Sequence, residues 1–291
     1  MVGLGYQEVI NYSFTPPEWE ADFAGNSTPV KVANPISSQM SVMRSNLIGG
    51  LIAAIKHNLN HGESRLKLFE LGRCFLQDVT NLEAQPEVLG GIAYGARFPE
   101  QWGEGGQKGA LTDFFTVKGE VETLLRGLHP RFEKATLCAF HPGRAAKISV
   151  GGEAVGLIGE LHPQWLQKYD LPSAPILFEM DISVIKGLEA PIFKPISRTP
   201  ILRRDIAVVV DDAVEIQSLV DAVCGTKVPT VIEFTPFDLY RGESVGMGKK
   251  SVAFRILMQD TDRTLVDLEA DEKVSEILNV INKEFGATLR K

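Results

Sequence analysis

Two histidines and one glutamate are the side chains in the first part of this chain that could support hydrolysis. Glu160 lies two positions before His162, and residues two apart on a strand share a face, so the two side chains could touch. His141 follows Cys138 by three residues, a spacing that alone is weak evidence for a metal site. Each histidine precedes a proline in a turn-like context, and no serine or cysteine nucleophile is tied to either. We therefore predict structural roles for them, with no catalytic residue and no metal site.

The last hundred residues contain the side chains that could contact RNA. Residues 192–291 contain 14 Lys and Arg against 16 Asp and Glu, a net charge of −2, which does not favour a general electrostatic grip on phosphate. The basic residues nonetheless concentrate at expected strand ends and in one loop, whereas the acidic residues concentrate in two expected helices. We predict RNA contacts from Arg255, Tyr240, Arg241, Lys249, Lys250, Arg198 and Arg203.

Alternation along one expected strand, residues 250–259, makes Arg255 the first choice among these. The side chains that should face the helices are Val252, Phe254, Ile256 and Met258. Arg255 is then the cation placed mid-sheet on the open face, and Tyr240 is the nearest candidate for stacking a base. The aromatic pair of an RRM is absent from these strands. The alternative is that Arg255 pairs with Asp205 or Asp211 on the neighbouring strand and serves only the fold.

The elements that would position these residues alternate in a recognisable order. Strands are expected over residues 204–210, 230–240, 250–259 and 287–289. Asp212 with Glu215 forms a possible capping box for a first helix, and Asp267 is a possible cap for a second helix that Gly286 closes. The order βαββαβ is the ferredoxin-like motif.

The first part of the chain has an amphipathic helix as its clearest element. Ser45 or Asn46 can cap its start, and residues 60–62 are a natural stop. Its apolar side chains form two adjacent lines, which exceeds what one small core needs. We therefore predict that part of this surface is a subunit interface; the alternative is full burial within the domain. The interface candidates are Leu47, Ile48, Leu51, Ile52 and Ile55.

Further strands and one helix are expected around this amphipathic helix. The expected strands span residues 3–14, 66–76, 88–94, 145–150, 154–161 and 175–182, and Thr112 or Asp113 can cap another helix. Three prolines over residues 188–200 predict a domain boundary. The sequence thus indicates an α+β protein with domains at 1–190 and 191–291.

The composition limits the protein class. A length of 291 residues suits two domains, a 44% hydrophobic content suffices for real cores, and no apolar run approaches a membrane span. The three cysteines are widely spaced, which predicts reduced thiols in a cytosolic protein. The net charge of −7 is unremarkable for solubility.

Several separated sequence blocks resemble one known family in the right order. The blocks are NPIS, MRSNLI, LFELGRCF, HPGRAA, GELHP, TPILRRDIA, DLYRG and KKSVAFR, and the resemblance runs from Gly3 to Arg290. They resemble the bacterial phenylalanyl-tRNA synthetase β subunit. The resemblance implies a degenerate class II aminoacyl-tRNA synthetase-like antiparallel sheet domain without catalytic residues, followed by a ferredoxin-fold anticodon-binding domain. It also implies that Met1 begins a fragment lacking amino-terminal RNA-binding and editing modules.

The resemblance further implies a role and partners. The family's enzyme charges tRNA(Phe) in the cytoplasm with ATP and Mg²⁺, which belong to the holoenzyme, so no cofactor is expected on this chain. Its α subunit carries the catalytic residues and packs with β in an αβ pair that doubles. This chain would scaffold α and recognise the anticodon region, with no membrane partner. The segment from His61 to Arg65 is too short for the usual ATP-gripping loop, so Arg44 and Arg73 are expected to hold structure.

Two other functions remain open at this point. One is a free-standing RNA-binding or assembly protein that kept both domains without ligase activity. The other is an autonomous ATP-using enzyme with an unrecognised site. Co-purification with an α subunit separates the first from the ligase, and ATP–pyrophosphate exchange by the chain alone would support the second.

Overall fold

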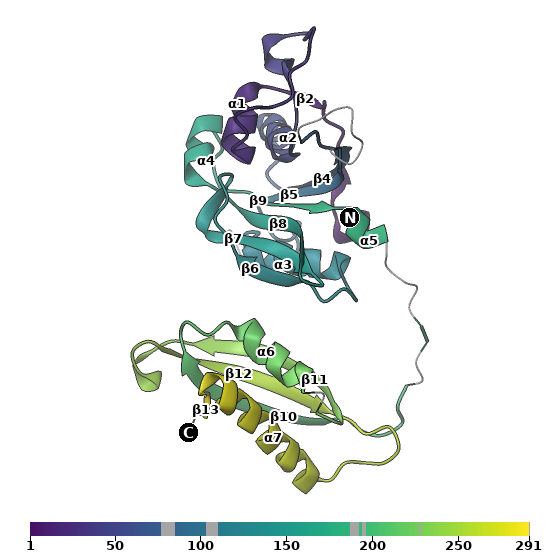
Figure 1. Ribbon diagram of the computed structural model, residues 1–291, viewed down its shortest axis with the longest axis vertical. Coiled ribbons are helices and arrows are strands. Elements are labelled where there is room, and N and C mark those ends of the chain that lie inside the picture. The colour runs from purple at the N-terminus through teal and green to yellow at the C-terminus, as the bar shows by residue number, and fades with distance from the viewer. Residues whose placement is uncertain (77–84, 103–109, 187–191, 194–195, 227, 291) are drawn as a thin grey trace. The chain divides into compact units, whose positions relative to one another are not determined.

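A computed structural model describes residues 1–76, 85–102, 110–186, 192–193, 196–226 and 228–290. The chain divides into two compact units, Met1–Ala190 and Pro191–Lys291 (Figure 1). Part of the predicted domain boundary at 188–200 lies outside the described residues. Each unit has its own hydrophobic core and is described separately below.

A seven-stranded sheet forms the centre of unit 1. Its order is β1-β4-β5-β9-β8-β7-β6, and every neighbouring pair is antiparallel except β1 with β4. The strands are β1 Gln7–Glu8, β4 Leu66–Arg73, β5 Glu87–Tyr94, β6 Arg131–Lys134, β7 Phe140–Val150, β8 Glu153–Leu161 and β9 Ile176–Asp181. A small second sheet pairs β2 Phe14–Thr15 with β3 Val42–Met43. A hairpin around Gly151 and Gly152, between the strands predicted at 145–150 and 154–161, joins β7 to β8, and both glycines adopt positive φ.

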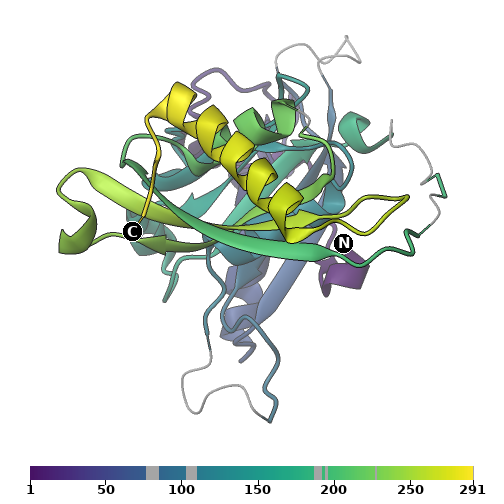
Figure 2. The same cartoon turned by 90° about the horizontal axis from the view of Figure 1, so that it is seen from below.

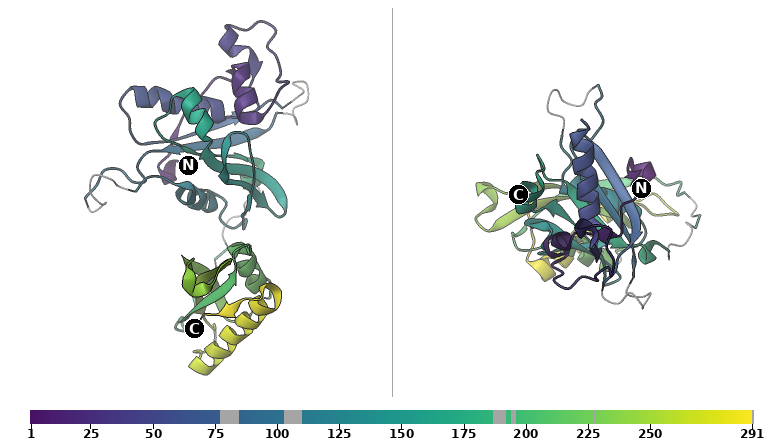
Figure 3. Two further views of the ribbon diagram at one scale, coloured as in Figure 1. Left: turned by 90° about the vertical axis from the view of Figure 1, so that its left-hand side faces the viewer. Right: turned by 90° about the horizontal axis from the view of Figure 1, so that it is seen from above.

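Helices α2 and α3 cover opposite faces of this sheet (Figure 3). Helix α2 spans Ile48–Asn60 as the apolar repeat predicts, and the Oδ1 of Asn46 accepts from the Ile48 N–H at its start. Helix α3 spans Phe114–Leu124, and its predicted cap Asp113 accepts from the Thr116 N–H. Short helices α1 Pro17–Trp19, α4 Pro163–Tyr169 and α5 Ser183–Lys186 complete the unit.

The apolar surface of α2 is not available to another subunit. All five interface candidates, Leu47, Ile48, Leu51, Ile52 and Ile55, are at most 3% exposed. The sheet covers one side, where Gly90 brings the backbone of β5 against Leu47 and Leu51, and the amino-terminal segment covers another, where the Trp19 ring lies on Gly49. The interface prediction is therefore corrected, because the second apolar line is covered within the same unit.

The strand predicted over residues 3–14 is also wrong in its extent. A 3₁₀ turn occupies Val2–Leu4, Gly5 adopts a left-handed φ of 82°, and β1 contains two residues only. The chain then leaves the sheet edge, so Ile10 is 93% exposed, and Asn11 donates to Glu70 at 2.7 Å. The polar and apolar residues alternate here in a segment that crosses from the sheet to the outer side of α2. There a five-residue helical turn, Glu20–Ala24, follows α1.

Unit 2 confirms the predicted βαββαβ order. Its elements are β10 Leu202–Asp211, α6 Ile216–Gly225, β11 Val231–Tyr240, β12 Lys249–Met258, α7 Asp267–Phe285 and β13 Thr288–Leu289. The sheet order is β11-β12-β10-β13 with antiparallel neighbours, which is the ferredoxin-like arrangement. Both helices lie on one face of the sheet (Figure 2). Gly286 closes α7 in the left-handed conformation, as predicted.

Two predicted helix caps in unit 2 are wrong. Helix α6 begins after Glu215 without a side-chain cap, because Asp212 instead accepts from Arg241 at 2.7 Å. Helix α7 begins after Val266, whose N–H donates to Glu269, while Asp267 lies in the first turn and pairs with Arg204. In both cases a cation distant in sequence takes the carboxylate that the local pattern assigned to the helix.

Candidate functional site

The open face of the unit 2 sheet presents Arg255 as alternation predicts. The inward set on β12, Val252, Phe254, Ile256 and Met258, is fully buried against the helices. The Arg255 side chain is 37% exposed, and its Nη2 lies 2.6 Å from Oε1 of Glu233 on β11. The ion pair considered in the alternative thus exists, but its partner is Glu233 rather than Asp205 or Asp211. A partly exposed pair of this kind remains accessible to a ligand.

A second arginine on the same sheet is also held by a carboxylate. Arg203 donates to both oxygens of Asp205, at 2.9 and 2.7 Å, and this hydrogen bonding lowers the pKa of Asp205. Asp205 lies directly opposite Arg255 in the strand register. Four charges thus form an interleaved set of two cations and two anions, so this part of the face has no excess positive charge. An RNA phosphate that binds here would have to replace a carboxylate as the partner of one of these arginines.

Tyr240 ends β11, Arg241 begins the loop that follows, and Lys249 and Lys250 begin β12. Tyr240 is 39% exposed, and the Arg290 guanidinium covers its ring at 4.8 Å. Arg241 pairs with Asp212, and Lys249 is exposed. Lys250 is only 5% exposed and donates to the Asp212 carbonyl at 2.9 Å, which makes it a poor RNA contact. A cavity of about 290 Å³ adjoins this loop.

The seven RNA candidates do not converge on one point. Arg198 is exposed before β10 begins, Arg203 lies near that same sheet end, and Arg255 lies mid-sheet. Tyr240, Arg241 and Lys249 lie at the opposite end, since β12 runs antiparallel to β10 and β11. The sequence reasoning missed Glu233 and Arg290. Glu233 could have been found because it shares a face with Arg255 on paired strands, whereas no local signal placed Arg290 beside Tyr240.

In unit 1 the arginine expected to be structural lies in a buried polar network. Arg44 is 6% exposed, its Nη1 lies 2.6 Å from Oε1 of Glu70, and its Nε donates to the Arg73 carbonyl at 3.0 Å. Glu20 accepts from the Ser45 N–H at 2.9 Å and from its hydroxyl at 2.5 Å. The Nη1 and Nε donors of Arg44 are thus engaged by groups of the same unit.

A third glutamate of this network caps α2 from a distant strand. Glu179 on β9 accepts from the Leu47 N–H at the start of the helix. Burial raises the pKa of Glu179 to about 7, although that hydrogen bond and Arg44 oppose the shift. The cavity beside the network holds about 20 Å³, too little for a nucleotide.

The two histidines have the structural roles predicted for them. The His141 Nδ1 accepts from the Gly143 N–H at 3.0 Å, and the His162 Nδ1 accepts from the Gln164 N–H at 3.1 Å and caps α4. Glu160 pairs with Arg144 and not with His162. Within the described ranges no group of three His, Cys, Asp or Glu could hold a metal ion, and no helix there is long and apolar enough to cross a membrane.

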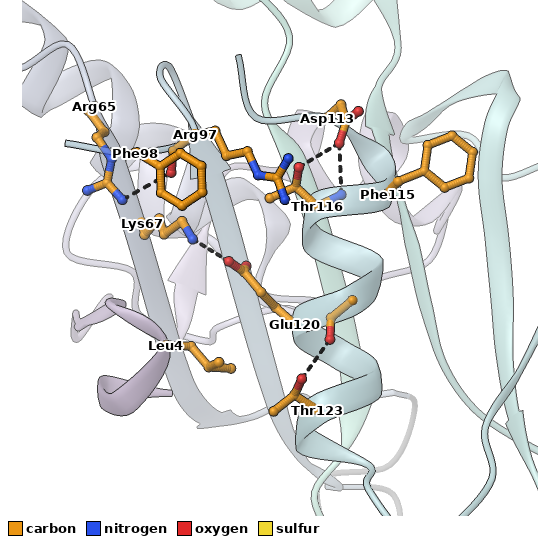
Figure 4. Close-up of a pocket in the computed structure, with 11 residues that line it drawn as sticks. Leu4, Arg65, Lys67, Arg97, Phe98, Asp113, Phe115, Thr116, Glu120 and Thr123 are labelled. Carbon is orange, nitrogen blue, oxygen red and sulfur yellow. Dashed lines mark hydrogen bonds and ion pairs between the residues drawn. The ribbon is translucent and has the colours of Figure 1, made fainter. Parts of the chain in front are cut away.

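A cleft in unit 1 is a feature that the sequence did not indicate. It has a volume of about 540 Å³ and lies in unit 1 between α3 and the adjoining ends of β4 and β5 (Figure 4). Lys67 and Glu120 form an ion pair at its floor, and Tyr6 donates to Glu120 at 2.7 Å. Arg65, Arg97, Phe98 and Thr116 line it higher up.

Two family models match this chain. The model described as the phenylalanyl tRNA synthetase beta chain CLM domain matches residues 1–182. The model described as the ferredoxin-fold anticodon binding domain matches residues 197–290, which include the open sheet face of unit 2. Together the two matches cover most of both units.

The curated relatives of this chain are named phenylalanine–tRNA ligase beta subunits. The phenylalanine–tRNA ligase beta subunit of Dechloromonas aromatica is 45% identical over 293 residues, covering 98% of this chain and 36% of that protein. The one from Chromobacterium violaceum is 44% identical over 290 residues, covering 100% of this chain and 36% of that protein. The chain therefore spans about a third of the length of these relatives.

Among solved structures, a pyrrolysyl tRNA synthetase of Desulfitobacterium hafniense matches with a TM-score of 0.46 and 11% identity. The match covers 64% of this chain and 61% of that one. The family assignment depends on the model that covers residues 1–182. This chain belongs to the phenylalanyl-tRNA synthetase β chain family.

Proposed function

We propose that this chain is part of the β subunit of a phenylalanine–tRNA ligase and that unit 2 recognises the anticodon region of tRNA(Phe). The match of unit 2 to the anticodon binding domain, on a ferredoxin-like sheet with both helices on one face, carries this proposal. The relatives named as ligase beta subunits support it. No comparable observation favours a free-standing RNA-binding protein.

Aminoacylation would take place on a separate α subunit, with this chain as scaffold. Arg44, a core arginine that could have gripped ATP, is engaged by Glu70 and by the Arg73 carbonyl. ATP and Mg²⁺ would then belong to the holoenzyme in the cytoplasm, in an αβ pair that doubles. Since the five apolar side chains predicted as an interface are buried, the contact with α would use other surface.

Recognition would proceed by exchange of ion-pair partners on the open face. Arg255 lies 2.6 Å from Glu233, so a phosphate or base edge must displace that carboxylate to bind the guanidinium. Tyr240 is 39% exposed and has one ring face against Arg290, so a base would stack on the opposite ring face. The net charge of −2 over residues 192–291 means that such placed contacts, rather than bulk charge, would supply the affinity.

The test is tRNA(Phe) charging by the assembled full-length enzyme carrying Arg255→Ala. We expect KM for tRNA to rise roughly five- to a hundredfold, the range for losing one specific contact, with kcat little changed. Arg263→Ala is the matched control, because Arg263 is also surface-paired, to Glu269, and is not on the open face.

An unchanged KM together with a lower melting temperature would show that Arg255 serves only the fold. Absence of tRNA(Phe) charging by the assembled wild-type enzyme would instead overturn the ligase assignment itself. The two outcomes test different parts of the proposal.

A further inference from the structure

The cleft beside α3 in unit 1 has cationic groups that the fold leaves unused. Arg65 and Arg97 both line it, and within the described part of the chain neither makes an ion pair. Arg97 lies against the Phe98 ring at 5.2 Å, and Arg65 makes one long hydrogen bond, 3.5 Å, to the Arg97 carbonyl. Guanidinium groups at a cleft wall without a carboxylate are available to an external anion.

The acids of the cleft are already engaged. Glu120 accepts from Lys67 and Tyr6 at the floor. Asp113 accepts from the Thr116 N–H at 2.8 Å and from its hydroxyl at 2.6 Å, which helps hold the pKa of Asp113 below its ordinary value. Figure 4 shows Lys67 pointing at Glu120, and Arg97 extending toward the first turn of α3. The charge of Arg97 also lowers the pKa of Asp113. The lining thus has three cations, Arg65, Lys67 and Arg97, against the two carboxylates of Asp113 and Glu120, which leaves one positive charge in excess.

Unsatisfied polar atoms gather at the same place. Among the described residues, three buried side-chain nitrogen or oxygen atoms lack a hydrogen-bond partner. One is Nε of Arg65, in the cleft wall. A second is Oγ1 of Thr112, the residue directly before Asp113. The backbone N–H of Thr112 donates to the Gly95 carbonyl at 2.9 Å. A buried donor that the fold leaves without an acceptor can be satisfied by water or by a bound acceptor. The unpartnered Nε is therefore compatible with an acceptor-rich ligand in this cleft.

The lining favours a polar ligand over a protein segment. Protein interfaces have an apolar, aromatic centre, whereas this cleft has an ion pair at its floor, and hydroxyls from Thr116 and Thr123. The apolar side chains of its lining are Leu4, Phe98 and Phe115. A volume of about 540 Å³ lies in the range of ligand-binding clefts.

We propose that this cleft binds a phosphate group carried on a sugar, held by the guanidinium groups of Arg65 and Arg97. The phosphate could belong to an RNA backbone or to a free nucleotide, because both present the same oxyanion beside hydroxyls. This site lies in unit 1 and is separate from the anticodon-binding role proposed for unit 2. It does not depend on that role.

The experiment is calorimetric titration of the 291-residue chain with inorganic phosphate, AMP and a single-stranded RNA hexamer at low salt. We expect saturable binding that weakens about tenfold in Arg65→Gln and again in Arg97→Gln, as for loss of one charged hydrogen-bonding group. Arg126→Gln is the control, because Arg126 is an exposed arginine just beyond α3 that does not line the cleft. Melting curves of all variants establish that they fold.

The probes separate the two sources. Tighter binding of the hexamer than of AMP assigns the site to an RNA backbone, and equal or tighter binding of AMP assigns it to a free nucleotide. Arg255→Ala should leave binding in this cleft unchanged, which keeps the result distinct from the test of unit 2. Absence of saturable binding, equal affinity in the arginine variants, or binding of succinate without phosphate would overturn the proposal.

Discussion

Two arginine–glutamate pairs, one in each unit, have the same contact length and opposite surroundings. In unit 1, Arg44 and Glu70 approach to 2.6 Å with side chains 7% and 4% exposed. In unit 2, Arg255 and Glu233 approach to 2.6 Å with side chains 37% and 36% exposed. The first pair lies under the amino-terminal segment, and the second lies on a sheet face without helices.

Burial decides what each pair can do. Taking charges from water carries a large desolvation cost, so a buried pair is maintained only if every donor is satisfied, and removing one partner is strongly destabilising. Arg44 also donates to the Arg73 carbonyl, which adds a second buried contact to the pair. A partly exposed pair is screened by water, contributes little to stability, and can exchange partners. The same two residue types thus stabilise the fold in unit 1 and remain open to exchange with a ligand in unit 2.

The largest expected effect is that of breaking the buried pair. Arg44→Met should lower the free energy of unfolding of unit 1 by about 3–5 kcal/mol, because Glu70 is left buried without its cation. Arg255→Met should leave unfolding nearly unchanged. Urea unfolding followed by tryptophan fluorescence measures the Arg44→Met effect selectively, since all three tryptophans, Trp19, Trp102 and Trp165, precede residue 190. Circular dichroism follows the unfolding of Arg255→Met, because unit 2 contains no tryptophan. If Arg44→Met lowered the free energy of unfolding only slightly, the buried and the exposed ion pair would not differ in their contribution to stability.

The buried network should also make unit 1 sensitive to pH. Burial raises the pKa of Glu179 from 4.5 to about 7, so between these values the folded state retains a proton that the unfolded state has lost. Stability should therefore fall as pH rises from 4.5 to 7 and level off above 7.

Glu179→Gln isolates this effect because it keeps an oxygen that can accept from the Leu47 N–H. Relative to wild type, the variant should gain stability between pH 5 and pH 8, by at most about 3 kcal/mol at roughly 1.4 kcal/mol per pKa unit. Glu153→Gln, at an exposed turn, should not alter the profile. An identical pH profile for Glu179→Gln and wild type would contradict the raised pKa.

Close packing of the amino-terminal segment over α2 should make small helix residues indispensable in unit 1. A Cβ at Gly49 would collide with the Trp19 ring, so Gly49→Ala should destabilise unit 1 by about 1–3 kcal/mol. Gly225, in the last position of α6, has open space around it, so Gly225→Ala should be neutral or stabilising. Circular dichroism melts compare the two variants, and equal effects would show that α2 is less tightly covered.

The smallest expected effect is that of removing the carboxylate partner of Arg255 in unit 2. Glu233→Gln releases Arg255 from its carboxylate and removes a negative charge that RNA would have to displace. We expect tRNA(Phe) affinity of the assembled enzyme to rise two- to fivefold at low salt, with the difference shrinking as salt rises. Filter binding across a salt series measures it. Unchanged or weaker binding would mean that Glu233 orients Arg255 productively.

Much of the fold could be predicted from local patterns. Helix α2, the hairpin between β7 and β8, and the whole βαββαβ order of unit 2 follow from period and turn residues, which depend on near neighbours in sequence. The inward set on β12 was predicted because strand alternation is fixed by backbone geometry. Apart from the extent of the strand at residues 3–14, the predictions that failed concerned contacts: the α2 interface, two helix caps and the partner of Arg255.

By itself, the sequence determined the elements, their order and the family. Only the tertiary structure decided which charged side chains pair with one another and which apolar side chains are covered. Glu179 reaches α2 across 132 residues, and Glu233 reaches Arg255 across 22, so no local pattern contains either pairing. The physical reason is that burial and desolvation depend on what covers a residue from elsewhere in the chain. That is why Arg44 became structural, Arg255 stayed accessible, and the cleft at Arg65 and Arg97 was not predicted.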